Sequence, residues 1–274
     1  MARGVGSQWR YDEAQLQRRL WSPIILQPGI FVDSRSSQNS LSASGVESVA
    51  NLGTAFASFN RGTLAYTQLS LHNANGLPYL NKQILNVPNA SGYHSSDTYS
   101  LQPTNGFSAY HFGLTHASSY AMDLSQWSVQ QSMILAANYN TGFQIALFDG
   151  VWRSRTTTTQ TSTDNLPVIM AQRKTAASAT SFIDTFLSTY RTNTVRTSIS
   201  CNNYTANATT VGFQGHPIGT ADTKGKTFLS LHFQRYLTDR EDDLVLGWGA
   251  WYCQMQHLLP ANHPFVNRPP LIGD

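Results

Sequence analysis

The sequence predicts an all-β protein: an antiparallel β-sandwich, or jelly roll, with one C-terminal helix and a short N-terminal arm. Many short apolar or alternating runs are separated by turn residues, which is typical of antiparallel sandwiches. One long helical pattern occurs, close to the C-terminus, and no Gly-, Ser- or Pro-rich linker divides the 274 residues. We therefore expect a single domain at 23–274, preceded by an arm at 1–22.

The arm precedes the first strand pattern. Residues 11–21 are predicted to form a short amphipathic helix, and an isolated helix of this length is marginal in water. The helix must therefore pack on something, and the sequence leaves open whether this is its own sandwich or a neighbouring subunit. A contact with another subunit would use Trp9, Tyr11, Leu16, Arg18, Arg19, Leu20 and Trp21.

The body of the chain carries a series of candidate strands. Residues 227–233 alternate between apolar and polar side chains, which suits a strand with one buried face. Asp149-Gly150 lies between two such runs and is the strongest hairpin signal in the chain. The predicted strands are 24–32, 62–71, 107–114, 128–138, 143–148, 151–158, 167–173, 181–187, 195–200 and 227–236.

The long helix is predicted at 238–257. Thr238 is followed three residues later by Glu241, which predicts a capping box. Gly247 and Gly249 weaken the helix by about 1 kcal/mol each, so tertiary packing must hold it. Pro260 ends the pattern. Apolar residues recur at helical spacing on one face: Leu244, Trp248, Trp251, Tyr252, Met255 and Leu259.

Motifs at both ends of the chain point to one family. The C-terminal motifs are Leu237-Thr238-Asp239, 247–251, Leu259-Pro260, His263-Pro264-Phe265 and Pro269-Pro270. The N-terminal motifs are Leu20-Trp21-Ser22-Pro23, 30–33 and Gly45-Val46. Together they resemble the concanavalin A-like lectin (laminin-G-like) domains of bacteriophage structural proteins, over about residues 20–270. The resemblance implies a laminin-G-like sandwich in a virion protein.

The chain departs from the family pattern in two places. The usual Trp-x-Asp-x-Ser-Gly segment is replaced by residues 49–53, and the internal Asn-Gly hairpin is blurred at 201–203. The fold that the resemblance implies is little affected, but it supports no calcium or sugar site tied to those loops.

The composition of the chain limits the kinds of partner that we expect. Only 12% of residues are charged and the net charge is +3, so a nucleic-acid groove is disfavoured. No apolar run is long enough to span a membrane, and the N-terminus lacks a signal-peptide core. We expect synthesis in the bacterial host cytoplasm and a final location in the virion. Cys201 and Cys253 are expected to be buried, reduced thiols.

Catalytic patterns are missing from the sequence. A glycosidase needs two carboxylates roughly 5–9 Å apart, and no predicted strand carries such a pair on one face. Glu47 is the single glutamate of the sandwich body, and the acidic cluster 239–243 is explained by helix capping. No nucleophile elbow or histidine metal motif occurs. We expect no enzyme, no catalytic residue, no metal ligand and no cofactor, with calcium left open.

Binding is the function that remains. Sugar sites on such sandwiches use exposed aromatic rings, and the candidates are Trp152 with Arg153 and Arg155, and Tyr93 with Tyr99 in a polar loop. For each, core packing is the competing interpretation. We expect a non-catalytic tail, baseplate or fibre-associated attachment module that binds host surface glycan. The alternative is a head decoration or adaptor protein with a purely structural role. The expected partners are other virion proteins and further copies of the chain in a symmetric assembly, with no nucleic acid and no membrane.

Overall fold

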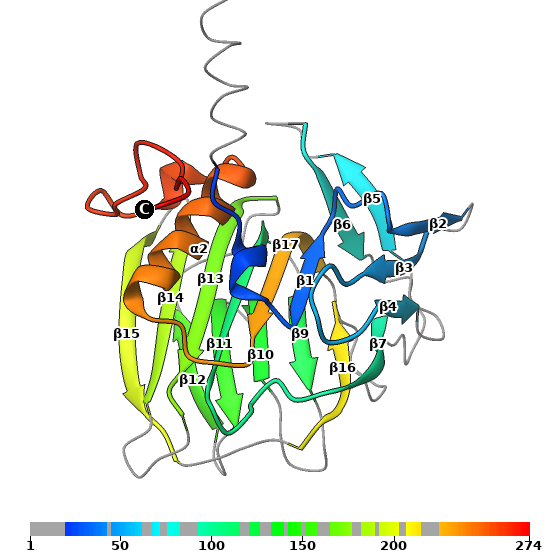
Figure 1. Ribbon diagram of the computed structural model, residues 1–274, viewed down its shortest axis with the longest axis horizontal. Helices are drawn as coiled ribbons and strands as arrows, with labels where there is room; N and C mark the ends of the chain where they lie inside the picture. Colours follow the sequence, from blue (N-terminus) through cyan, green and yellow to red (C-terminus); the bar gives the residue numbers. More distant parts are fainter. Residues whose placement is uncertain are drawn as a thin grey trace, which may run out of the picture.

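The computed structural model describes residues 20–42, 45–61, 67–71, 76–82, 93–115, 121–126, 133–139, 142–148, 152–157, 165–176, 182–189, 192–202, 207–214 and 225–274. This part of the chain forms two antiparallel sheets that face each other, with one α-helix laid across the outer face of one of them (Figure 1). The predicted all-β sandwich with a helix near the C-terminus is confirmed.

The sheet that carries the helix is called the helix-side sheet. It has eight strands, and β1 pairs with β17 beside the main path. In order across the sheet, the strands are β15 (Thr192–Ser200), β14 (Phe182–Thr189), β13 (Pro167–Lys174), β8 (Phe107–Leu114), β17 (Gly225–Phe233), β6 (Pro78–Lys82) and β5 (Thr67–Leu71), with β1 (Ile30–Asp33) next to β17.

The second sheet is called the opposite sheet and has nine strands in the described part of the chain. In order, they are β12 (Trp152–Thr157), β11 (Gly142–Phe148), β10 (Met133–Tyr139), β9 (Ala121–Gln126), β16 (Thr209–Phe213), β7 (Tyr93–Tyr99), β4 (Ser58–Arg61), β3 (Gly45–Ala50) and β2 (Ser40–Ser42). Strands β11 and β12 pair antiparallel with Phe148 opposite Trp152, which confirms the predicted hairpin, although Asp149 and Gly150 lie outside the described residues.

The centre of the helix-side sheet is buried on both faces, as its strand β8 illustrates. Phe107 and Ala109 belong to the core between the two sheets, whereas Tyr110 and Phe112 belong to a second core beneath the helix. This division follows from the period of two in a strand, which sends alternate side chains to opposite faces. The first core includes Phe59, Leu80, Tyr93, Val168, Met170 and Phe213, and the second includes Ile169, Leu229, Leu231, Leu244, Trp248 and Phe265.

The helix α2 spans Asp239–Tyr252 and begins as predicted. The Thr238 hydroxyl accepts a hydrogen bond from the Glu241 N–H, and the Glu241 carboxylate accepts from the Thr238 N–H, which completes the capping box. The predicted end at residue 257 is wrong. Gln254 adopts a left-handed conformation with φ 56°, and the Met255 N–H bonds to the carbonyl of Ala250. The helix therefore stops in a Schellman-like turn.

The glycines inside α2 have a packing role. A Cβ on Gly247 would lie 2.7 Å from the side chain of Phe265, and a Cβ on Gly249 would overlap the ring of Phe112. The helix therefore approaches the sheet and the C-terminal segment more closely than alanine would allow. A short 3-10 helix, η2 (Gln256–Leu258), follows the turn. Among the described residues, no helix is long and apolar enough to cross a membrane.

The first predicted strand is partly wrong. Pro23–Leu26 forms a 3-10 helix, η1, in which the Ser22 hydroxyl accepts from the Ile24 N–H, because Pro23 suits the first helical turn. Predictions at 107–114, 167–173 and 227–236 are close to β8, β13 and β17. The strands that were not predicted lie mainly in the opposite sheet, where short segments rich in Ser, Thr and Asn obscure the alternation: 40–42, 45–50, 58–61, 93–99, 121–126 and 209–213.

The start of the described chain belongs to the sandwich rather than to an arm. Leu20 forms a β-bridge with Leu271, and the Trp21 N–H donates to the carbonyl of Pro270 at 3.1 Å. The Trp21 side chain is 6% exposed in the core beneath α2. Its prediction as a contact with another subunit is therefore wrong, because its own chain covers it. The predicted contacts Trp9, Tyr11, Leu16, Arg18 and Arg19 lie outside the described residues. Cys201 and Cys253 are both buried and form no disulfide, as predicted.

Candidate functional site

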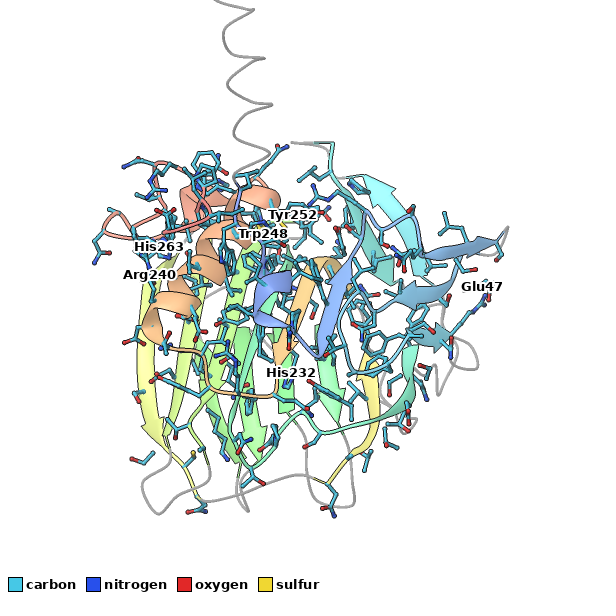
Figure 2. All side chains as sticks on the ribbon, in the orientation of Figure 1. Glu47, His232, Arg240, Trp248, Tyr252 and His263 are labelled. Carbon is cyan, nitrogen blue, oxygen red and sulfur yellow. The ribbon has the colours of Figure 1, made fainter. Side chains whose placement is uncertain are left out.

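An open groove lies on the outer face of the helix-side sheet, at the end where α2 begins. It is called the α2 groove and has a volume of about 550 Å³. His263 and Arg240 lie on this side of the helix (Figure 2). The groove is lined by Ala171, Arg173, Asp184, Thr185, Phe186, Thr197, Ser198, Asp239, Asp242, Asp243, Pro260, Asn262, His263 and Pro264.

Strand pairing builds the floor of the groove. In the register of β13 and β14, Arg173 lies opposite Asp184 and Ala171 lies opposite Phe186. Ser198 of β15 continues the row as the partner of Asp184. Since Ala171 and Phe186 are almost fully buried, the floor has an apolar part next to a row of polar side chains.

Arg173 organises the polar half of the floor. Its guanidinium lies 3.2 Å from Asp184, 2.9 Å from Asp239 and 3.7 Å from Asp242, and also donates to the carbonyl of Leu237 at 3.0 Å. Burial alone would lower the pKa of Arg173, but the charge of Asp242 and the hydrogen bond to Asp239 outweigh burial and raise it. One buried cation thus joins two strands to the first turn of α2.

Two tyrosines donate hydrogen bonds to the carboxylates of this cluster, Tyr110 from β8 and Tyr236 from the segment before α2. The Tyr110 hydroxyl donates to Asp242 at 2.6 Å, and the Tyr236 hydroxyl donates to Asp184 at 3.0 Å. Burial raises the pKa of Tyr236 to about 12, so its hydroxyl stays a donor at neutral pH. Asp242 is 2% exposed and is enclosed within the network.

The C-terminal segment forms the wall opposite the strands. The His263 Nδ1 accepts from the Phe265 N–H at 3.2 Å, so in the neutral ring Nε2 carries the hydrogen. That Nε2 lies 3.6 Å from the Asp243 carboxylate. The Trp251 indole N–H donates to the Phe265 carbonyl at 2.7 Å. The His-Pro-Phe motif therefore clamps the C-terminal segment onto α2 and shapes the groove.

The groove is acidic although the chain is basic. Among the described lining residues, four aspartates face one arginine, whereas the whole chain carries a net charge of +3. The side chain of Asp239 is 86% exposed, that of Asp243 is 28% exposed and that of Asp184 is 24% exposed. Because the Arg173 side chain is only 5% exposed, a ligand entering the groove meets carboxylates first.

A second polar cluster lies at the other end of α2. The Tyr252 hydroxyl donates to the Asp33 carboxylate, the Arg35 guanidinium lies 3.3 Å from the centre of the Tyr252 ring, and the Trp248 ring stacks on the same ring at 4.5 Å. Burial raises the pKa of Tyr252. Figure 2 shows Trp248 and Tyr252 side by side near the end of the helix. This cluster ties α2 to β1.

The predicted sugar-stacking tyrosines are core residues. Tyr93 and Tyr99 are the first and last residues of β7, not part of a loop, and are 0% and 5% exposed. The Tyr93 hydroxyl donates to the carbonyl of Val46, and the Tyr99 hydroxyl bonds to His232. Their prediction as an exposed sugar site is wrong, because both rings fill the space between the sheets.

The other predicted site stays a prediction. Trp152, Arg153 and Arg155 lie on β12, the edge strand of the opposite sheet, with Arg153 paired to Leu147. Their side chains are outside the described residues. The α2 groove was not predicted from the sequence. Two sequence features belong to it, the acidic cluster 239–243 and the His-Pro-Phe ending. Each had a local explanation: helix capping for the acidic cluster and a turn for the His-Pro-Phe ending. In the part of the chain that the structure describes, no group of three or more His, Cys, Asp or Glu is placed to hold a metal ion.

The fold and the groove define a two-sheet antiparallel β-sandwich with a candidate binding site beside its helix. No family model matches the chain, and no curated protein matches it. Among solved structures, a crystal structure of an HCR/D mutant is similar, with 8% identity and a TM-score of 0.44. The match covers 82% of this chain and 52% of that chain, so this chain spans about half the length of that structure.

Proposed function

We propose that this chain is a non-catalytic structural protein of a bacteriophage virion, a tail, baseplate or fibre-associated attachment module that binds host surface glycan. The observation that carries the binding proposal is the α2 groove, whose volume is about 550 Å³. This volume lies in the range of small-molecule sites. The groove combines an apolar floor with hydroxyl, amide and carboxylate groups.

The lining suits a ligand that is rich in hydroxyl groups. The hydroxyls of Thr197 and Ser198 and the side-chain amide of Asn262 can each donate and accept hydrogen bonds. The rings of Pro260 and Pro264 offer apolar surface of the kind that contacts the C–H face of a sugar. Carboxylates accept hydrogen bonds from sugar hydroxyls, and charged acceptors make the stronger bonds.

The virion part of the proposal is supported by the motifs at the two ends of the chain. These motifs meet in the structure: Leu20 pairs with Leu271, and Trp21 bonds to Pro270. Phe265 of the His-Pro-Phe motif packs against Gly247 of α2. Several of the residues that carry the family resemblance thus fasten the helix and the C-terminal segment to the sandwich.

The proposal that the protein is not an enzyme is supported by the contacts that the groove carboxylates make. Asp184, Asp239 and Asp242 all contact the guanidinium of Arg173. Such a shared cation holds carboxylates in place as a structural cluster. A two-carboxylate hydrolase instead needs one carboxyl group that carries a proton and a second that attacks or activates water.

A polysaccharide array tests the proposal. The full chain is applied to immobilised bacterial surface polysaccharides, alongside the variant Ser198→Trp, which fills the groove from β15. The control is Ser200→Trp, which adds the same bulk at an exposed site on the same strand outside the groove. We expect binding by the chain and the control and loss of binding by Ser198→Trp, with no release of reducing ends. Absence of binding, or binding that survives the block, contradicts glycan binding in the groove.

A head decoration or adaptor role is favoured by a different observation. Among the described residues, the exposed large apolar side chains are Ile24, Ile25, Leu41 and Ile272, and three of these lie on segments next to Leu20, Trp21 and their partners. Exposed apolar residues gathered in this way are typical of an assembly surface.

Particle assembly separates the two roles. Deletion of residues 1–19 leaves Leu20 and Trp21 in place, so we expect a folded, soluble sandwich that no longer enters virions. Ile25→Asp should also lower occupancy, whereas Leu41→Asp, on the distant β2, should not. Loss of occupancy without any glycan binding by the intact chain favours the adaptor role. Unchanged occupancy in both Ile25→Asp and the deletion contradicts this assembly surface.

A further inference from the structure

We infer that the α2 groove selects a glycan that carries a free amino group, that is, a cationic amino sugar. This inference rests on the proposed function, because it names the ligand class of the same groove. It combines the shape and the hydroxyl-binding groups of the groove with the sign of its charge.

The charge that a ligand meets is negative. Asp243 and Asp184 line the groove, and their side chains are only about a quarter exposed, at 28% and 24%, so protein shields most of each side chain from bulk water. Attraction between charges is screened less in such partly buried places than on an open surface. Asp239, at 86% exposed, adds a third carboxylate at the rim.

The described arginines near the groove do not balance its four aspartates. Arg173 lies beneath the carboxylates and is 5% exposed. Arg235 forms two bonds of 2.7 and 2.9 Å with the Glu241 carboxylate. The Arg240 guanidinium lies 5.5 Å from the Phe265 ring, and Arg240 is not part of the groove lining. The groove therefore keeps an excess of negative charge that these arginines do not cancel.

The helix terminus does not reverse this sign. A helix N-terminus carries about half a positive charge. In α2, however, the capping box satisfies the first turn internally through Thr238 and Glu241. The remaining carboxylates of Asp239, Asp242 and Asp243 outnumber that partial charge.

The geometry of an ammonium group matches this lining. An ammonium has three N–H donors and no acceptor, so it is complementary to a groove that several carboxylates line. The ring hydroxyls of the same sugar can bond to Ser198, Thr197 and Asn262, which line the same groove. A sugar with an acetamido or hydroxyl group in place of the amine keeps the hydroxyl contacts and loses the charge.

Three tetrasaccharides with one backbone provide the probes: β-1,4-linked glucosamine, its N-acetylated form, and the corresponding glucose oligomer. Affinities are measured by calorimetry with the full chain, at mildly acidic pH and at two salt concentrations. We expect the glucosamine oligomer to bind about tenfold more tightly than the other two, equivalent to about 1.4 kcal/mol. We also expect this advantage to shrink in high salt.

Variants locate the selectivity. Asp243→Asn removes a groove charge without removing its hydrogen-bonding shape and should abolish the preference for the amine. Asp97→Asn removes the same charge from an exposed position of β7, in the opposite sheet, and should leave the preference unchanged. Ser198→Trp should abolish binding of all three oligomers. Thermal unfolding of each variant shows whether it remains folded, and Asp239→Asn at the exposed rim replaces any variant that does not.

The outcomes separate the inference from the proposed function. If all three oligomers bind equally and Ser198→Trp abolishes binding, the groove is a glycan site and the amino selectivity is wrong. The inference is overturned if the preference for the amino sugar persists in Asp243→Asn and Asp239→Asn, or if the glucosamine oligomer does not bind. In either case the polysaccharide array remains a separate test of glycan binding. If a tetralysine peptide competes as well as the amino sugar, the groove recognises positive charge and not the sugar. This result also overturns the inference.

Discussion

The hydroxyl of Tyr99, on β7, lies 2.9 Å from Nδ1 of His232, on β17, and this bond joins the two sheets inside the core. The His232 Nε2 lies 2.9 Å from the carbonyl of Leu101, so Nε2 carries the hydrogen and the Tyr99 hydroxyl donates to Nδ1. The His232 ring also stacks on Phe107 at 5.6 Å. Figure 2 shows His232 in the interior of the sandwich. Burial raises the pKa of Tyr99 and lowers that of His232 to about 4.

Removal of this hydroxyl should destabilise the fold. Tyr99→Phe leaves the buried Nδ1 of His232 without its donor, and an unsatisfied buried group costs about 1–3 kcal/mol. Denaturant unfolding followed by tryptophan fluorescence measures the change. Tyr236→Phe gives the comparison: its hydroxyl donates to Asp184, but the residue is only half-buried, so water can replace the hydroxyl and we expect a smaller loss of stability. A stability of Tyr99→Phe equal to that of the unmodified chain would show that the sheets do not depend on this bond.

His232 should make stability depend on pH. Its folded-state pKa of about 4 lies below the ordinary value of 6.5, so between these values the unfolded chain binds a proton that the folded chain does not. Stability should therefore fall as pH decreases from about 6.5 to about 4. We expect His232→Gln to flatten this region of the curve. Equal slopes in the unmodified chain and His232→Gln would contradict the assignment.

The two tryptophans of α2 should differ in their contribution to stability. Trp248 is 8% exposed, packs edge-on against Phe31 and stacks on Tyr252. Trp248→Ala should therefore cost about 3–5 kcal/mol. Trp251 is only partly buried and makes one bond to the Phe265 carbonyl, so Trp251→Ala should cost less, about 2 kcal/mol. Chemical unfolding of both variants measures the difference. A larger loss in Trp251→Ala would show that the clamp on the C-terminal segment outweighs the core.

Gly249→Ala should destabilise the chain although alanine is the better helix former. The intrinsic gain is about 1 kcal/mol, but the new methyl group would overlap the Phe112 ring, and overpacking costs about 1–3 kcal/mol. The double variant with Phe112→Leu provides room for the methyl group, so we expect the penalty of Gly249→Ala to be smaller in that background. A double-mutant cycle measures this coupling. Additive effects would contradict a direct contact.

Local patterns in the sequence determined the fold class and the start of the helix. The capping box of Thr238 and Glu241 involves residues three apart, so its chemistry is contained in one short segment. Strand β13 is buried almost throughout and begins with the apolar run 168–171, which is consistent with a buried strand. The strand β7 was not predicted from the sequence. Its tyrosines are buried because they lie between the two sheets, and a local pattern does not show this.

Tertiary structure alone determined which residues meet in the α2 groove and which packing role the helix glycines have. Arg173 and Asp184 are eleven residues apart and meet through the pairing of β13 and β14, while Asp239 and His263 reach the same groove from the helix and the C-terminal segment. No local pattern contains such a convergence, because it depends on strand register and on where the helix docks. Gly247 weakens an isolated helix, and only the position of Phe265 shows why the folded protein uses it.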